Sequence, residues 1–181
     1  MTSAELRPGA AAHTLRIDPA LNIAVEAPRQ SELVALLEQS TAYARSLGYP
    51  PESNFLLDVD ALERPGVRVY VARDEGGRAL GLAALVALDP DTDGGRPGDA
   101  ELKRMFVSAA ARGRGVAGAL LGRIEADAAA HGIRRLLLET GDLHDSALAL
   151  YGKHGYREID QFGQYIGEKH SICMAKPLAE E

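Results

Sequence analysis

A glycine-rich turn between an apolar strand and an apolar-periodic helix constrains the fold of this chain more than any other feature. Residues Arg112–Gly118 spell Arg-Gly-Arg-Gly-Val-Ala-Gly and lead directly into a segment with helical spacing of its apolar residues. Glycine lets a backbone approach a ligand closely and adopt φ values closed to other residues. The first N–H groups of a helix lack intrahelical acceptors and carry partial positive charge. We therefore predict that this turn holds a phosphorylated cofactor.

The composition favours one soluble globular domain. The chain has 181 residues, of which 46% are hydrophobic and 25% charged, which suffices for one core and is short for two. The net charge of −6 gives no basic footprint for nucleic acid. The single cysteine, Cys173, excludes an internal disulfide and a multi-cysteine metal site, and we expect no metal. No run has the length of a membrane span and no signal-peptide pattern is present, so we expect a cytoplasmic protein without a membrane partner.

Hydrophobic periodicity and turn residues predict the element order β-α-α-β-β-β-α-β-α-β-β. The predicted strands are residues 21–25, 67–73, 79–88, 101–107, 135–139, 156–159 and 171–176. The predicted helices are residues 28–47, a short helix ending at 62, one from the glycine turn to about 132, and 145–154. A hairpin followed by a βαβ unit gives a mixed sheet with helices on its faces, an α/β architecture. Residues 1–20 are expected to form a loosely ordered arm and residues 21–181 one domain.

Dinucleotide binding is the first alternative for the glycine turn. Gly113–Gly118 matches the pattern G-x-G-x-x-G, and Glu139 lies at about the distance expected for a ribose-binding acid. However, residues 108–112 separate the strand from the first glycine, whereas a Rossmann strand runs almost directly into it. Only about 40 residues follow Glu139, too few for further βαβ repeats. No Gly-Lys-Ser/Thr follows the turn either, so both a nicotinamide or flavin site and a Walker loop are poor interpretations.

Two motifs point instead to one family. Arg112-x-x-Gly115-x-Ala117 resembles the cofactor signature Gln/Arg-x-x-Gly-x-Gly/Ala of the GNAT superfamily of N-acetyltransferases. The segment 147–156 is similar to the second family motif, a helix that ends in Leu-Tyr-x-x-x-Gly-Phe/Tyr. The resemblance covers about residues 22–177 and indicates a small bacterial-type, single-domain member. It implies the GNAT fold: a mostly antiparallel central sheet with a splayed parallel pair and helices on both faces.

The resemblance implies acetyl-CoA as the donor and CoA as the product. Main-chain N–H groups of the glycine turn would hold the pyrophosphate, through Arg112, Gly113, Arg114, Gly115, Val116, Ala117 and Gly118. The pantetheine arm would pair with the backbone near Phe106 and Val107. His144 occupies the position where the family often has an asparagine that touches this arm, although a surface-loop histidine is an equal alternative.

Acetyl transfer to an amine requires a neutral nucleophile, a stabilised oxyanion and a proton for the departing thiolate. Tyr151 occupies the position where GNAT proteins often carry a tyrosine acid; its alternative is packing against Leu148. Glu101 is the candidate base, because charged residues in a central strand are costly unless they line a cleft. The alternatives are an ion pair of Glu101 with Lys103 or Arg104 at a solvated strand end, and deprotonation of the amine through water.

Acceptor recognition is expected from two loops, residues 49–54 and 163–170, with Tyr49, Asn54 and Tyr165 as candidate substrate contacts. The predicted function is transfer of acetyl from acetyl-CoA to a primary amine of a small molecule or amino acid by direct attack. A protein or peptide N-acetyltransferase and a non-catalytic acyl-CoA-binding protein are the alternatives. Family analogy alone suggests a homodimer.

Overall fold

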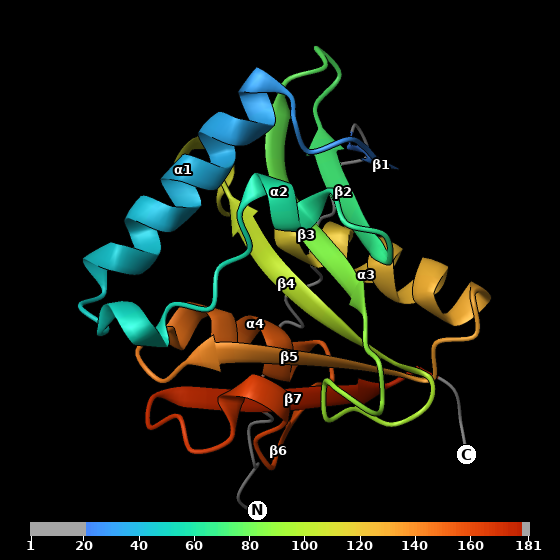
Figure 1. Cartoon of the computed structure of the whole chain (residues 1–181). Coiled ribbons are helices and arrows are strands. Elements are labelled where there is room, and N and C mark those ends of the chain that lie inside the picture. The colour runs from blue at the N-terminus through green and yellow to red at the C-terminus, as the bar shows by residue number, and fades with distance from the viewer. Residues whose placement is uncertain (1–20, 179–181) are drawn as a thin grey trace, which may run out of the picture.

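Seven strands form one mixed sheet with helices on both faces in the computed structural model, which describes residues 21–178 (Figure 1). The strands are β1 (Asn22–Val25), β2 (Val67–Arg73), β3 (Ala79–Ala87), β4 (Asp99–Val107), β5 (Arg135–Gly141), β6 (Arg157–Ile159) and β7 (Ser171–Pro177). The helices are α1 (Ser31–Ser46), α2 (Val59–Leu62), α3 (Val116–Ala130) and α4 (Asp145–Lys153). Short 3₁₀ turns lie at Pro51–Ser53, Ala109–Ala111 and Gly163–Tyr165.

The order of elements predicted from the sequence is confirmed for the described residues. β2 has the predicted bounds, while β5 continues past Glu139 to Gly141 because its last residues pair with the start of β7. The first helix begins at Ser31 rather than Pro28, and the chain leaves it at Gly48, whose φ of 80° suits glycine. The predicted arm, residues 1–20, lies outside the described residues. No helix within residues 21–178 is long and apolar enough to cross a membrane.

The sheet has the strand order β1-β2-β3-β4-β5-β7-β6, and only β4 and β5 are parallel neighbours. These two strands pair at their first halves, from Asp99–Leu102 on β4 to Arg135–Leu138 on β5. Beyond Leu102 and Leu138 they separate, and Figure 1 shows the two strands diverging. The predicted sheet with one splayed parallel pair is therefore confirmed.

A β-bulge interrupts β4 at the point of separation. Lys103 pairs with Ala84 and Phe106 with Leu82, so that Arg104 and Met105 both lie opposite Ala83. Arg104 has a φ of 56°, and no other non-glycine residue in the described range has positive φ. A bulge of this kind bends its strand and changes the direction of the side chains that follow.

Each face of the sheet has its own apolar core. α3 and α4 cover one face, where Leu120, Leu121 and Ile124 of α3 are fully buried. Burying such a side chain contributes about 1.5–3 kcal/mol. α1 and α2 cover the other face through Leu33, Leu36, Leu37 and Leu62. A third apolar cluster lies beside β5 and β7, on the face of the sheet next to the segment that follows α1. Its members are Leu137, Phe162, Tyr165, Cys173 and Ala175.

Candidate active site

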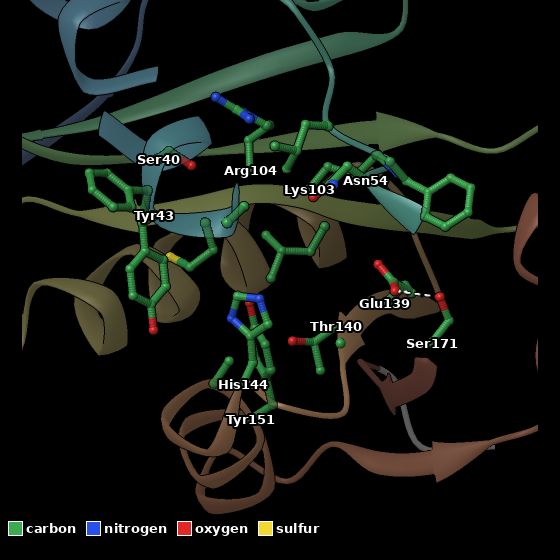
Figure 2. Close-up of a pocket in the computed structure, with 18 of the residues that line it drawn as sticks. Ser40, Tyr43, Asn54, Lys103, Arg104, Glu139, Thr140, His144, Tyr151 and Ser171 are labelled. Carbon is green, nitrogen blue, oxygen red and sulfur yellow. Dashed lines mark hydrogen bonds between the residues drawn. The ribbon is translucent and has the colours of Figure 1, made fainter. Parts of the chain in front are cut away.

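The diverging ends of β4 and β5 open into a cavity of about 530 Å³. Its walls come from the second half of α1, the segment after it, β4, β5, the start of α4 and the loop before β7. Figure 2 shows polar side chains from β4 and β5 on opposite sides of this space, with Tyr151 and His144 below. Because β4 and β5 are hydrogen-bonded only at their first halves, the fold itself creates the opening.

The predicted glycine turn lies beside this cavity. Gly113 and Gly115 have φ values of 78° and 79°, and Gly115 is the N-cap of α3. A Cβ built on Gly113 would meet nothing within 4 Å, so the turn presents open backbone. The N–H groups of Val116 and Ala117 belong to the first helical turn, where no intrahelical acceptor exists. The turn therefore fits a phosphate group, with partial positive charge from a fifteen-residue helix.

Arg112 connects the turn to the cavity. Its Nε donates to the carbonyl of Val107 at 3.4 Å, and its guanidinium lies 5.3 Å from the centroid of the Tyr43 ring. Phe106, Val107, Arg112 and Ala117 all line the cavity. A ligand that has its phosphates on the turn can thus extend along the free end of β4 into the space between the strands.

Tyr151 projects from α4 into the cavity, below His144 (Figure 2). Its ring also packs edge-on against Tyr156 in the apolar core, at 5.6 Å between centroids. Within residues 21–178 its hydroxyl has no hydrogen-bond partner. Burial raises the pKa of Tyr151, and the charge of Glu139 raises it further. Tyr151 therefore stays protonated at neutral pH, as a proton donor must.

Glu101 belongs to a buried polar network on the floor of the cavity. Its side chain accepts a hydrogen bond from the hydroxyl of Tyr165 at 2.5 Å and an ion-pair contact from Lys103 at 3.2 Å. Lys103 also contacts the hydroxyl of Tyr165. Glu101 is only 5% exposed, so its pairing with Lys103 occurs inside the cavity and not at a solvated strand end.

Glu139 is a second carboxylate in the cavity and is not among the site residues predicted from the sequence. Its Oε1 accepts a hydrogen bond from Ser171 at 2.6 Å, which Figure 2 shows as a dashed line. Burial raises the pKa of Glu139, and the hydrogen bond from Ser171 and the charge of Lys103 oppose this only in part. The sequence feature that could have indicated Glu139 is its position as a single carboxylate directly after the apolar run Leu136–Leu138.

Tyr49 and His144 line the cavity between the segment after α1 and the loop before α4. The hydroxyl of Tyr49 donates to Asp142 at 3.2 Å and accepts from the N–H of Leu143 at 2.5 Å. The Tyr49 ring lies nearly parallel to that of His144, with centroids 6.0 Å apart. Burial lowers the pKa of His144, which favours its neutral form. Tyr49 thus ties the segment after α1 to the loop before α4.

The fold brings most of the predicted site residues together. The cavity is lined by Tyr49, Asn54, Glu101, Phe106, Val107, Arg112, Ala117, His144, Tyr151 and Tyr165. The remaining predicted residues, Gly113, Arg114, Gly115, Val116 and Gly118, form the adjoining turn and the first residues of α3. Asn54 also donates to the carbonyl of Pro50 at 3.3 Å and so supports the turn of its own segment. Tyr165 is fully buried between Phe55 and Phe162 and reaches the cavity through its hydroxyl.

Comparison with known proteins relates the chain to one family. Residues 32–156 match the model of the acetyltransferase (GNAT) family. A curated relative, the IAA acetyltransferase of Azospirillum brasilense, is 42% identical over 160 residues, which cover 88% of this chain and 99% of the relative.

Solved structures show the same fold at lower identity. An acetyltransferase of the GNAT family from Staphylococcus aureus superposes with a TM-score of 0.70 at 20% identity, covering 88% of this chain and 100% of the other. The PaiA N-acetyltransferase of Thermoplasma acidophilum, solved in complex with coenzyme A, gives a TM-score of 0.65 at 14% identity over 87% and 98% of the two chains.

Proposed function

Because the chain belongs to the GNAT family of acetyl-CoA-dependent N-acetyltransferases, we propose that it acetylates a primary amine of a small molecule inside the β4–β5 cavity. The amine attacks the acetyl carbonyl directly, without an acetylated enzyme. One observation carries the proposal: the hydroxyl of Tyr151, which has no hydrogen-bond partner within residues 21–178, lines a single cavity beside the glycine turn with the buried carboxylate of Glu101 and the half-buried carboxylate of Glu139.

The size of the cavity favours a small acceptor over a protein. A volume of about 530 Å³ lies in the range typical of small-molecule sites. The contacts of Tyr49 with Asp142 and Leu143 link the segment after α1 to the loop before α4 and so bound the cavity on that side. The name of the Azospirillum brasilense relative, an IAA acetyltransferase, also supports a small-molecule acceptor.

In this proposal the donor is held by the glycine turn and the free end of β4. The N–H groups of residues 112–118 bind the pyrophosphate, and the backbone at Phe106 and Val107 pairs with the pantetheine arm. His144, neutral and at the N-cap of α4, offers one hydrogen bond to the same arm. Acetyl-CoA supplies the acetyl group as a thioester.

Tyr151 acts as the general acid. Its raised pKa keeps the proton on the hydroxyl at neutral pH, so Tyr151 enters the reaction as an acid and not as a phenolate. No neighbouring group within residues 21–178 accepts a hydrogen bond from this hydroxyl, so the proton is available to the leaving group.

The amine loses its proton to a carboxylate on the other side of the cavity. Glu101 is the base predicted from the sequence, but one of its oxygens already accepts from Tyr165 and Lys103. Glu139 is a second candidate, because Ser171 is its one hydrogen-bond donor among the described residues and burial raises its pKa. Replacement of each by Gln separates the two roles, since only loss of the base shifts the acidic limb of the pH–rate profile.

An acceptor screen that follows CoA release by thiol titration tests the proposed function. The panel holds amino acids, alkyl and aryl amines, amino sugars and a peptide with a free N-terminus. Cys173 adds little to the signal, because it is buried and burial raises its pKa to about 11. We expect amine-dependent CoA release with at least one small acceptor and an acetylated product of matching mass.

Two results would count against the proposal. Release of CoA with the peptide alone would favour the protein-directed alternative. Binding of acetyl-CoA, seen as a rise in melting temperature, with no release for any acceptor would favour the non-catalytic alternative.

A further inference from the structure

Arg104 is a buried cation in the wall of the cavity. It lies in the bulge of β4, is 8% exposed, and extends toward α1 near Ser40 (Figure 2). In a regular strand Lys103 and Arg104 would point to opposite faces. The bulge instead lets Lys103 reach the Glu101 network while Arg104 contacts α1, which packs on the same face.

The hydrogen bonds of Arg104 are all to neutral groups. One terminal nitrogen donates to the carbonyl of Leu37 at 2.8 Å, and the guanidinium lies 3.3 and 3.4 Å from the hydroxyl of Thr41. The Nε atom is buried and has no partner among the described residues. Arg104 thus carries a positive charge away from water without a counter-charge among the described residues. This arrangement is costly unless a bound ligand supplies the counter-charge.

Two other partly buried arginines of the chain have carboxylate partners. Arg73, with an 18% exposed side chain, is paired with Glu26 and Glu32. Arg135, with a 23% exposed side chain, is paired with Asp99 at 2.6 Å. Arg104 is more buried than either and has no carboxylate within ion-pair distance in the part of the chain that the structure describes.

Backbone strain at Arg104 also indicates a ligand site. A φ of 56° is unfavourable for a residue with a long side chain, and such strain is concentrated at ligand sites, where the surroundings enforce it. Burial lowers the pKa of Arg104 to about 10, which still leaves the guanidinium charged at neutral pH. The positive charge of Arg104 beside the cavity therefore lowers the stability of the fold.

The cavity has complementary charges on its two sides. Lys103 forms an ion pair with Glu101, whereas Glu139 on β5 accepts a hydrogen bond from Ser171 and has no ion-pair partner among residues 21–178. A half-buried carboxylate, Glu139, and a buried guanidinium, Arg104, in the walls of one cavity match a ligand with an ammonium group and a carboxylate. Phe55, Leu56 and Phe106 add apolar surface to the lining of the same cavity.

We propose that the acceptor is an amino carboxylate of the amino-acid class and that Arg104 binds its carboxylate through its guanidinium group. This inference rests on the proposed function and names the class of acceptor for that same site. Arginine is suited to this role because its planar fork matches a carboxylate bidentately.

Matched acceptors test the proposal. Phenylalanine, leucine and glutamate are each compared with their α-amides, which keep the amine and side chain but lack the α-carboxylate. The wild-type enzyme should show kcat/KM about 10- to 100-fold higher for the acid than for the amide, as expected for a charge-assisted hydrogen bond. In Arg104→Met the preference should fall toward one, mainly through KM for the acid, while Arg104→Lys should keep part of it.

Arg123→Met is the matched control, because Arg123 lies on α3 outside the cavity and pairs with Asp127. It should retain the full preference for the acids. Equal or better use of the amides by the wild-type enzyme would overturn this inference and leave the proposed function intact, whether or not the Arg104 variants fold. Persistence of the preference in folded Arg104→Met would also overturn it. Failure to acetylate any acid, amide or simple amine would contradict the proposed function itself.

Discussion

Charged side chains inside this protein are arranged in sets whose members depend on one another. Glu101, Lys103 and Tyr165 form a closed network in which each group contacts the other two. In a low-dielectric environment such a network is stable only when every member is present. The network therefore fixes both the charge and the shape of the cavity floor.

Replacement of Lys103 by Met should destabilise the protein by about 3–5 kcal/mol, because it leaves Glu101 buried without its cation. Urea denaturation measures this loss. The double variant Glu101→Gln/Lys103→Met should recover much of it, since no unpaired charge remains. Equal stability of the single and the double variant would contradict the dependence of Glu101 on Lys103.

Glu139 should make stability depend on pH. Its folded pKa is raised above the ordinary value of 4.5, so below about pH 4.5 both folded and unfolded states carry the neutral acid. As the pH rises through the folded pKa, the unfolded state ionises more readily, and the folded state loses stability. Urea denaturation of wild type and Glu139→Gln at pH 4.5 and 7.5 measures this effect. The variant should gain stability relative to wild type at the higher pH; a pH-independent difference would argue against a raised pKa.

At the scale of elements, the junction of β4 with α3 links donor binding to helix geometry. Gly115→Ala should cost about 1–2 kcal/mol, because the N-cap of α3 has a φ of 79°. It should also raise KM for acetyl-CoA by tilting the first N–H groups. Gly122 offers a matched control: it lies inside α3, and a Cβ there meets nothing within 4 Å.

Gly122→Ala should stabilise the helix by about 0.5–1 kcal/mol and leave KM for acetyl-CoA unchanged. Thermal denaturation and initial-rate kinetics of the two variants make the comparison. Similar values of KM for acetyl-CoA in both would show that the geometry of the turn does not govern donor binding.

The helices and strands could be predicted from the sequence because their signals are local. Gly48, Pro65 and Gly132 end helices or begin turns wherever they occur, and the apolar run Leu136–Leu138 defines a buried strand. The bulge at Arg104 could not be predicted, because it depends on the register between β3 and β4. Register depends on how two strands pair, so the sequence of one strand alone does not reveal it.

At the scale of the whole molecule, the cavity follows from strand order. β7 lies between β5 and β6, and this brings Ser171 beside Glu139 and the preceding loop with Tyr165 beside Glu101. The sequence predicts Tyr165 from its loop and Glu101 from its charge, but not their hydrogen bond across 64 residues. Glu139 escapes prediction for the same reason, since its partner is 32 residues away.

The kinetics of Tyr151→Phe and Tyr156→Phe show whether the Tyr151 hydroxyl donates the proton in acetyl transfer. The two tyrosines are neighbours in the core, but only Tyr151 lines the cavity. Tyr151→Phe should lower kcat about 10²- to 10⁴-fold with little change in KM for acetyl-CoA or in stability, because the hydroxyl has no partner in residues 21–178. Tyr156→Phe should keep its kcat. Equal kcat values for Tyr151→Phe and wild type would contradict the account of Tyr151 as the proton donor in acetyl transfer.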